Sequence, residues 1–280
     1  MVTRVANRYN GREHSRVIKV QQPTLAHEIL LYAWRHDQSI DALPASVRPT
    51  DIAAGYAIQD AVIAALGEPV AGYKIAATSA AGQAHIAIDH PISGQLRESR
   101  VLAPGTPAPM VGNTMRVAEA EFVFEFGVDV APRDTPYRVD EVMALIADLH
   151  LGIELPNARF RDFVGVGAAQ LIADNACAYA FVLGPRVAQP WRAVNLAAHP
   201  VRTLVDGEVV SRGVGGDALG DPRVALTWFV NHYRERGRRL AAGSFVTTGV
   251  CGKPAPIVPG QHVRVDFGVL GELSVDLTSV

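Results

Sequence analysis

Cysteine is scarce in this chain. Its two cysteines, Cys177 and Cys251, lie in separate segments and without C-x-x-C spacing. This scarcity argues against a disulfide framework or a cysteine-based zinc site, and it indicates two buried thiols in a reducing compartment. The nine histidines show no H-E-x-x-H spacing either, so His85 and His90 are interpreted as surface or core residues rather than metal ligands.

Long apolar runs and a strong net charge are absent as well. No run approaches the roughly 20 apolar residues that span a bilayer, and no apolar secretion signal is found at the N-terminus. We therefore expect a cytoplasmic protein without a membrane partner. The net charge of −2 gives no reason to expect nucleic acid as a partner. With 280 residues, 49% of them hydrophobic, the chain is long enough to bury the core of a soluble enzyme.

Apolar spacing and turn residues give a coarse map of helices and strands. Helices are expected over residues 23–34, 51–65, 79–87, 139–149 and 221–236. Strands are expected over residues 70–77, 116–127, 201–210, 244–249, 262–268 and 273–277, where 201–210 is a hairpin around Asp206 and Gly207. Helices gather early and strands late, which indicates an α+β fold rather than a doubly wound sheet.

Glu119 and Glu121 lie in the expected strand over residues 116–127. Side chains two apart in a strand project from the same face, so both carboxylates share one face. The even-numbered positions from 118 to 126, all alanine or phenylalanine, form an apolar stripe on the other face. Two half-buried like charges need a shared proton or a cation such as Mg2+ or Mn2+. The alternative is that both glutamates lie on the solvated face of a half-exposed strand.

Glu154 offers a third carboxylate. It lies in a short apolar segment, after a predicted helix and before Pro156, so solvation alone does not account for it. Lys74 is a lone cation within an apolar strand, and two interpretations of it stay open. Lys74 is either an edge-strand residue whose ammonium reaches water, or a desolvated ammonium with a lowered pKa that binds a carboxylate or moves a proton.

Three parts of the chain are predicted from composition. Residues 1–22 are biased toward arginine and are expected to form a flexible N-terminal extension. Residues 23–105 are expected to form a smaller α/β part, which ends in the Pro/Gly-rich stretch Ala103–Pro109. Residues 106–280 are expected to form a β-rich catalytic domain that carries the metal-binding candidates.

One glycine motif partly matches the fingerprint of a nucleotide-binding site. Gly213–Ala218 matches G-x-G-x-x-A and precedes a predicted helix. The element before it is a hairpin and the region after it is basic, so the match is interpreted as a tight turn that leads to the helix N-cap Asp221. The G-x-S-x-G elbow of serine hydrolases does not occur.

Ordered segments along the chain resemble the fumarylacetoacetate hydrolase superfamily, in the branch of 2-oxopent-4-enoate hydratases and 4-oxalocrotonate decarboxylases. The resemblance begins at about Thr24 and reaches the C-terminus. Its segments are Gly72–Ser79, Ile88–Gly94, Glu119–Glu121, Glu154 with Arg159, Ile172–Ala176, Leu219–Pro222, Val246–Gly249, Val258–Gly260 and Val265–Gly268. The ordered set implies a mixed β-sheet roll with a smaller N-terminal helical part, and assembly into a homo-oligomer.

The resemblance also implies a site. Glu119, Glu121 and Glu154 are expected to be the carboxylate ligands of a Mg2+ (or Mn2+) ion. Lys74 is expected to be a catalytic residue that binds substrate or carries protons, and Arg159 and Thr248 are expected to bind substrate with it. The implied substrate is a small 2-oxo or 2-hydroxy-dienoic acid, whose carboxylate and C2 oxygen bind the metal so that the enolate is stabilised.

Three activities are compatible with the resemblance. The main one is hydration of 2-hydroxypenta-2,4-dienoate (2-oxopent-4-enoate) by a hydro-lyase of aromatic-compound catabolism. The alternative is a carboxy-lyase, 4-oxalocrotonate (2-oxo-3-hexenedioate) decarboxylase, and the third is a non-catalytic relative that binds 2-oxo acids. The hydratases carry an acid where this chain has Ile92, whereas loss of CO2 needs no base to activate water. Asp89 is not expected to substitute, because three residues along a strand point to opposite faces.

Overall fold

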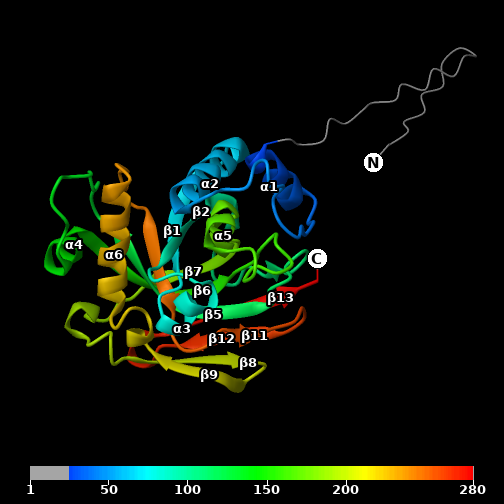
Figure 1. Ribbon diagram of the computed structural model, residues 1–280. Coiled ribbons are helices and arrows are strands. Elements are labelled where there is room, and N and C mark those ends of the chain that lie inside the picture. Colours follow the sequence, from blue (N-terminus) through cyan, green and yellow to red (C-terminus); the bar gives the residue numbers. More distant parts are fainter. Residues whose placement is uncertain (1–24, 280) are drawn as a thin grey trace, which may run out of the picture.

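The computed structural model describes residues 25–279. It consists of two β-sheets packed together, with α1, α2 and α5 gathered on one side and α4 and α6 on another (Figure 1). The α+β fold is therefore confirmed. The predicted N-terminal extension lies outside the described residues. Within residues 25–279, the structure has no helix long and apolar enough to cross a membrane.

The larger sheet runs in the order β2-β1-β10-β5-β6-β7-β3, with β11 paired to β5. Its central strands, β5 and β6, pair antiparallel along nearly their whole length. Strands from the two ends of the chain also meet in it, because β1 pairs in parallel with β10. The strands are β1 (Val70–Ala76), β2 (Ile92–Arg97), β3 (Val101–Leu102), β5 (Val117–Phe126), β6 (Ile146–Leu155), β7 (Ala180–Arg186), β10 (Phe245–Val250) and β11 (Ala255–Pro256).

The smaller sheet runs in the order β4-β13-β12-β8-β9. Its β8-β9 hairpin turns at Asp206 and Gly207, whose φ angles of 50° and 88° agree with the predicted turn. The strands are β4 (Ala108–Pro109), β8 (Pro200–Val205), β9 (Glu208–Val214), β12 (His262–Asp266) and β13 (Glu272–Thr278).

Helix ends follow capping residues in the sequence. The side chain of Asp51 accepts a hydrogen bond from the Ala54 N–H, and that of Asp221 accepts one from the Arg223 N–H. Asp51 begins the helix expected over residues 51–65, and Asp221 is the N-cap predicted for the helix over residues 221–236. The helices are α1 (Ala26–Arg35), α2 (Ile52–Leu66), α3 (Ala80–His85), α4 (Val139–Leu145), α5 (Ala168–Ala173) and α6 (Pro222–Glu235).

The phenylalanine face of β5 builds the core between the sheets. Phe122, Phe124 and Phe126 are fully buried. The Phe122 ring lies 4.9 Å, centroid to centroid, from the ring of Phe267, which follows β12, and the Phe124 ring lies 5.9 Å from Trp191. Each buried phenylalanine contributes about 2 kcal/mol of burial free energy. The predicted apolar stripe is therefore confirmed, and it anchors the odd-numbered residues of β5 on the opposite face.

One helix prediction is wrong in part. The helix expected over residues 139–149 ends at Leu145, and Ile146 begins β6. Apolar spacing in this stretch fits a helix, but residues from Ile146 onward pair with β5, and sheet pairing outweighs the local preference. The division at residue 105 stays a prediction, since β1, β2 and β3 share one sheet with strands from the later part of the chain.

Candidate metal and substrate site

Three carboxylates meet on the face of the larger sheet opposite the phenylalanines. Antiparallel pairing sets Glu119 of β5 directly across from Glu154 of β6, and Glu121 follows on the same face. One carboxylate oxygen of each lies within 4.8 Å of the others. Glu121 and Glu154 are 0% exposed and Glu119 is half-buried, so the interpretation that both paired glutamates lie on a solvated face is wrong for Glu121.

Glu121 is held by the neighbouring strand β10. Its Oε2 accepts a hydrogen bond from the Thr247 hydroxyl and a second one, of 2.8 Å, from the Gly249 N–H. Gly249 has a φ of +100°, and a Cβ there would lie 2.2 Å from the Thr78 hydroxyl. Only glycine therefore fits where β10 bends to point this N–H at the carboxylate.

Lys74 lies beside the carboxylates. Its Nζ is 3.0 Å from Glu154 Oε1, and the side chain is 3% exposed. Because β1 lies between β2 and β10, the edge-strand interpretation is wrong. Burial alone would lower the pKa of Lys74, but the negative charges of Glu154 and Glu119 raise it more, so the net shift is upward. The expectation of a lowered pKa is therefore also wrong, and Lys74 is a paired ammonium.

A left-handed turn supplies a second partner for Lys74. Asn175, Ala176 and Cys177 all have positive φ angles, of 62°, 50° and 63°, a conformation that costs roughly 1–2 kcal/mol per non-glycine residue. The turn directs the Ala176 carbonyl at Nζ of Lys74, over 3.1 Å. The Asn175 side-chain amide holds the turn by accepting from the Gln95 N–H and donating to the Gln95 carbonyl, both over 2.8 Å.

The carboxylate cluster has the electrostatics of a cation site. Burial and the negative charge of Glu154 raise the pKa of both Glu119 and Glu121. Among the described residues, Glu121 Oε1 and Glu154 Oε2 are buried without a hydrogen-bond partner. Lys74 alone balances only part of this negative charge. Buried carboxylates with free oxygens suit a hard divalent cation, so the residues present fit Mg2+ or Mn2+.

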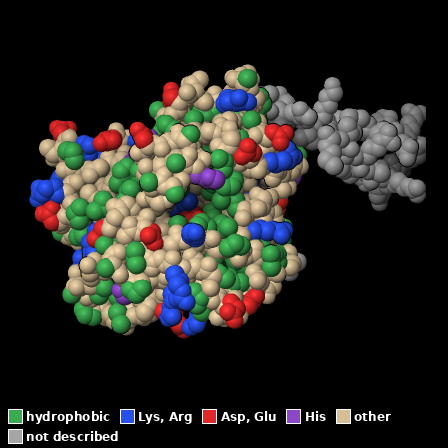
Figure 2. Space-filling model, turned by 60° about the horizontal axis from the view of Figure 1, so that its bottom comes forward, with side chains coloured by type: hydrophobic (Ala, Val, Ile, Leu, Met, Phe, Trp, Pro, Cys, Tyr) green, Lys and Arg blue, Asp and Glu red, His purple; other side chains and the backbone are tan. Residues whose placement is uncertain are grey.

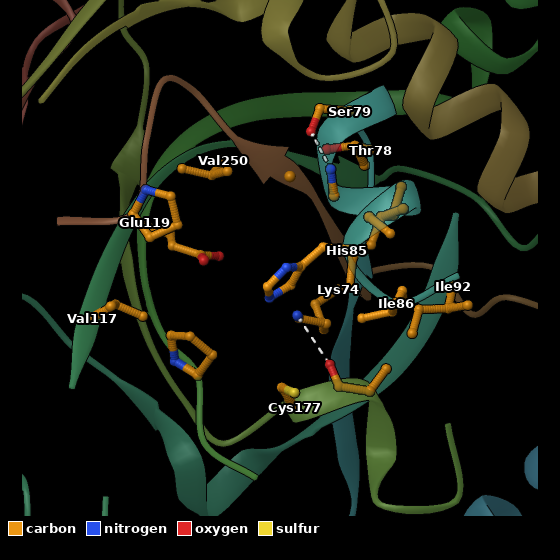
Figure 3. Close-up of a pocket in the computed structure, with 18 of the residues that line it drawn as sticks. Lys74, Thr78, Ser79, His85, Ile86, Ile92, Val117, Glu119, Cys177 and Val250 are labelled. Carbon is orange, nitrogen blue, oxygen red and sulfur yellow. Dashed lines mark hydrogen bonds between the residues drawn. The ribbon is translucent and has the colours of Figure 1, made fainter. Parts of the chain in front are cut away.

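A cavity of about 530 Å³ opens above the cluster. Glu119 and Lys74 reach it from the sheet, and Figure 3 shows both side chains directed into the same space. Most of its lining is apolar, and Figure 2 shows a hollowed face where charged side chains lie among hydrophobic ones. The apolar residues in its wall include Ile86, Ile92, Met115, Phe163 and Leu171. An anionic head next to the carboxylates and an apolar body fit this shape.

Two predicted substrate residues lie outside the described lining of the cavity. Arg159 is buried, with its guanidinium 5.5 Å from the Tyr179 ring centroid. The Thr248 hydroxyl donates to the Phe122 carbonyl over 3.0 Å. Their roles in binding substrate stay predictions. Asp89 is exposed and precedes β2, so the reasoning that placed it within a strand is wrong.

Sequence reasoning missed four contributors to the site. Thr247, the Ala176 carbonyl and the Gly249 N–H act through bonds that join distant segments. The fourth, His85, was interpreted as a surface or core residue, yet it lines the cavity. A signal for it existed: Ser79 is a helix N-cap, and a short helix beginning there ends at His85, beside the strand of Lys74.

The chain is similar to known proteins in sequence and in fold. A 2-keto-4-pentenoate hydratase of Burkholderia vietnamiensis is 32% identical over 76% of this chain and 79% of its own length. A 4-oxalocrotonate decarboxylase of Pseudomonas sp. strain CF600 is 30% identical over 75% of this chain and 78% of its own length. The fold matches a 4-oxalocrotonate decarboxylase from Pseudomonas putida G7, complexed with magnesium and adipate, with a TM-score of 0.82, 24% identity, and coverage of 90% of this chain and 95% of that one.

The family assignment rests on the greater part of the chain. The family model described as fumarylacetoacetate (FAA) hydrolase C-terminal matches residues 70–278. That range includes the three carboxylates, Lys74 and the strands that bring them together. The chain belongs to the fumarylacetoacetate hydrolase family.

Proposed function

We propose that this protein is a Mg2+-dependent lyase of small 2-oxo acids, with hydration of 2-hydroxypenta-2,4-dienoate as its main reaction. The observation that carries the proposal is the carboxylate cluster beside buried Lys74, at the floor of a largely apolar cavity. Relatives named 2-keto-4-pentenoate hydratase, up to 32% identical, support hydration.

Each side chain of the site has a role in this reaction. Glu119, Glu121 and Glu154 would hold the cation. When bound, the cation supplies electrophilic stabilisation of negative charge on the 2-oxo oxygen of a substrate. Lys74 Nζ, held by the Ala176 carbonyl at the edge of the cluster, binds the anionic head of the substrate or moves a proton there. The apolar wall limits the water that reaches the reacting carbons.

Decarboxylation of 2-oxo-3-hexenedioate is the second candidate, and Ile92 favours it. Ile92 is 0% exposed and borders the cavity, at the position where a hydratase of this family is expected to carry an acid. A diacid substrate also needs a cation for its second carboxylate. Lys253, which lines the cavity, offers one.

One experiment separates the candidates. The purified protein is given 2-hydroxypenta-2,4-dienoate or 2-oxo-3-hexenedioate with Mg2+, and loss of the dienoate absorbance and release of CO2 are measured. Turnover of the dienoate without CO2 release supports hydration, whereas CO2 release from the diacid supports decarboxylation. Binding of 2-oxo acids without turnover of either compound would identify the protein as a non-catalytic relative and contradict the proposal.

The proposal extends to the metal, the assembly and the compartment. Mg2+ is the proposed ion because the cluster offers carboxylate oxygens only, and a solved neighbour of this fold is complexed with magnesium. We also propose that the protein forms a homo-oligomer and acts in the cytoplasm. Sedimentation analysis would test the assembly, and metal analysis with competition among Mg2+, Mn2+ and Ca2+ would test the ion.

A further inference from the structure

His85 occupies a distinctive place in the cavity. It is the last residue of α3, and it contributes the one imidazole among the described residues of the cavity lining. Figure 3 shows its ring directed into the open space between Glu119 and Lys74. The ring packs edge-on against Phe163, with 6.0 Å between centroids. Its side chain is exposed, so protons exchange readily between solvent and the ring.

The position of His85 suits contact with a substrate rather than a metal. The described residues contain one group of carboxylates close enough together to hold an ion, and His85 is not a member of it. Helix α3 lines the cavity across from Glu119. A molecule whose head lies at the carboxylates would therefore extend its far carbons toward the imidazole.

The other titratable groups of the cavity are poorly suited to give a proton to carbon. The ammonium of Lys74 is held between Glu154 Oε1 and the Ala176 carbonyl, over 3.0 and 3.1 Å. Burial raises the pKa of the Cys177 thiol to about 12. Glu119 belongs to the carboxylate cluster, and Lys253 offers an ammonium, a group that in general gives up a proton less readily than an imidazolium. Histidine is the side chain that both donates and accepts a proton near neutral pH.

We propose that His85 is the proton donor to the far carbon, C5, of the bound dienoate. This inference rests on the proposed function. As the 2-hydroxyl loses its proton to water, the C2 oxygen becomes a carbonyl and the C2–C3 double bond moves to C3–C4. The electron pair of the C4–C5 double bond forms a new C5–H bond with the imidazolium proton. The neutral imidazole then regains a proton from solvent, so protons and electrons balance.

The test compares His85→Gln with His90→Gln. His90 is also exposed and near in sequence, but it lies outside the described lining of the cavity, so it is the matched control. The reaction is run in D2O with Mg2+, and kcat, KM and deuterium at C5 are measured by absorbance and NMR. His85→Gln should lower kcat about 100-fold with little change in KM, and the rate at which deuterium enters the C5 methyl group should fall by about the same factor. His90→Gln should match the parent.

The pH profile is a second readout. The groups that face His85 across the cavity are Lys74, Glu119, Cys177 and Lys253. In the parent protein kcat should fall on the alkaline side as the imidazolium is lost, and this limb should vanish in His85→Gln. Added imidazole should restore part of the activity of His85→Ala. Binding of 2-oxopentanoate with Mg2+, measured by calorimetry, should be the same in the parent and His85→Gln.

The possible failures are distinguishable. If the parent turns over the dienoate and His85→Gln keeps the same kcat, pH profile and rate of deuterium entry at C5, the role of His85 is overturned and the proposed function stands. If the parent turns over neither the dienoate nor the diacid, the proposed function fails and this inference fails with it. Loss of 2-oxopentanoate binding in His85→Gln would assign the residue to binding rather than to proton transfer.

Discussion

The two faces of strand β5 bury very different chemistry. On one face Phe122, Phe124 and Phe126 are fully buried in the core that they share with residues of the smaller sheet. On the other, Glu119 and Glu121 meet Glu154 around oxygens that lack hydrogen-bond partners among the described residues. Burial of the phenylalanines is favourable, whereas burial of the carboxylates of Glu121 and Glu154 costs free energy.

The comparison shows where the stability of the site comes from. The carboxylate face does not stabilise the fold. Burial and like charge disfavour the charged carboxylates and so raise the pKa of Glu119 and Glu121. The phenylalanine face holds the same backbone through its packing. Within β5, the even-numbered phenylalanines therefore stabilise the fold, and the odd-numbered Glu119 and Glu121 form the candidate cation site. The following predictions test whether the two faces can be changed separately.

Glu121→Gln should cause the largest loss of function. In the absence of metal it should also make the protein more stable. It removes one of the three charges of the cluster, so activity and Mg2+ affinity should fall at least about 1000-fold, by analogy with the loss of an electrostatic group from an active site. Without metal the variant should unfold at a higher temperature than the parent, because a buried repulsion is gone. Turnover assays, metal titration and calorimetry would measure these changes.

The matched control for that variant is Glu125→Gln. Glu125 lies on the same strand and the same face, but it pairs with His150 and Arg186 near the surface. It should keep parental activity and metal affinity. If Glu121→Gln retained full activity, the carboxylate cluster would have no role in metal binding.

Phe122→Ala should show the reverse pattern. It leaves a cavity between the sheets and should lower the free energy of unfolding by about 4 kcal/mol, measured by urea denaturation. The Mg2+ affinity of the protein that remains folded should change little. Val123→Ala, at the adjacent buried position on the opposite face, is the comparison. A large loss of metal affinity in Phe122→Ala would show that the two faces are not separable.

Lower pH should stabilise the metal-free protein. The pKa values of Glu119 and Glu121 are raised in the folded state, so the folded protein binds protons more tightly than the unfolded chain does. The free energy of unfolding should therefore rise, on the order of 2 kcal/mol, as pH falls through these raised values toward the unfolded value near 4.5. Saturating Mg2+ should reverse this slope, because protons then compete with the ion. Urea denaturation across pH, with and without Mg2+, would measure both slopes.

Thr247→Val should have the smallest effect. It removes the hydroxyl that donates to Glu121 Oε2 but keeps the shape of the side chain. Metal affinity should fall about tenfold, as for other residues that support a metal ligand, with stability nearly unchanged. Thr248→Val is the control, since that hydroxyl donates to the Phe122 carbonyl instead. An equal loss of affinity in both variants would contradict a specific role for Thr247.

Much of the fold was predictable from local signals. Alternation in β5 predicted both faces, and the caps Asp51 and Asp221 placed two helices correctly. The end of α4 was not predictable. It is set by the pairing of β6 with β5, a long-range contact that the local sequence pattern does not indicate.

The site was predictable only in its charged residues. Carboxylates in apolar segments stand out in a sequence, and so does Lys74. The Ala176 carbonyl and the Gly249 N–H are backbone groups, and nothing in their side chains indicates which way they point. His85 was not predicted as a site residue, because its spacing to other residues matches no metal-ligand motif and the cavity wall that it joins exists only in the folded chain.

The pairing of Glu119 with Glu154 has a consequence for how this protein acquires its ion. The two residues come from different strands, and Glu121 is completed by Gly249 from near the end of the chain. A slip of β6 by one residue would turn Glu154 toward the phenylalanines. No short segment of the chain therefore contains the complete ion site. We expect the cation to bind tightly only after β5, β6 and β10 have paired in the correct register.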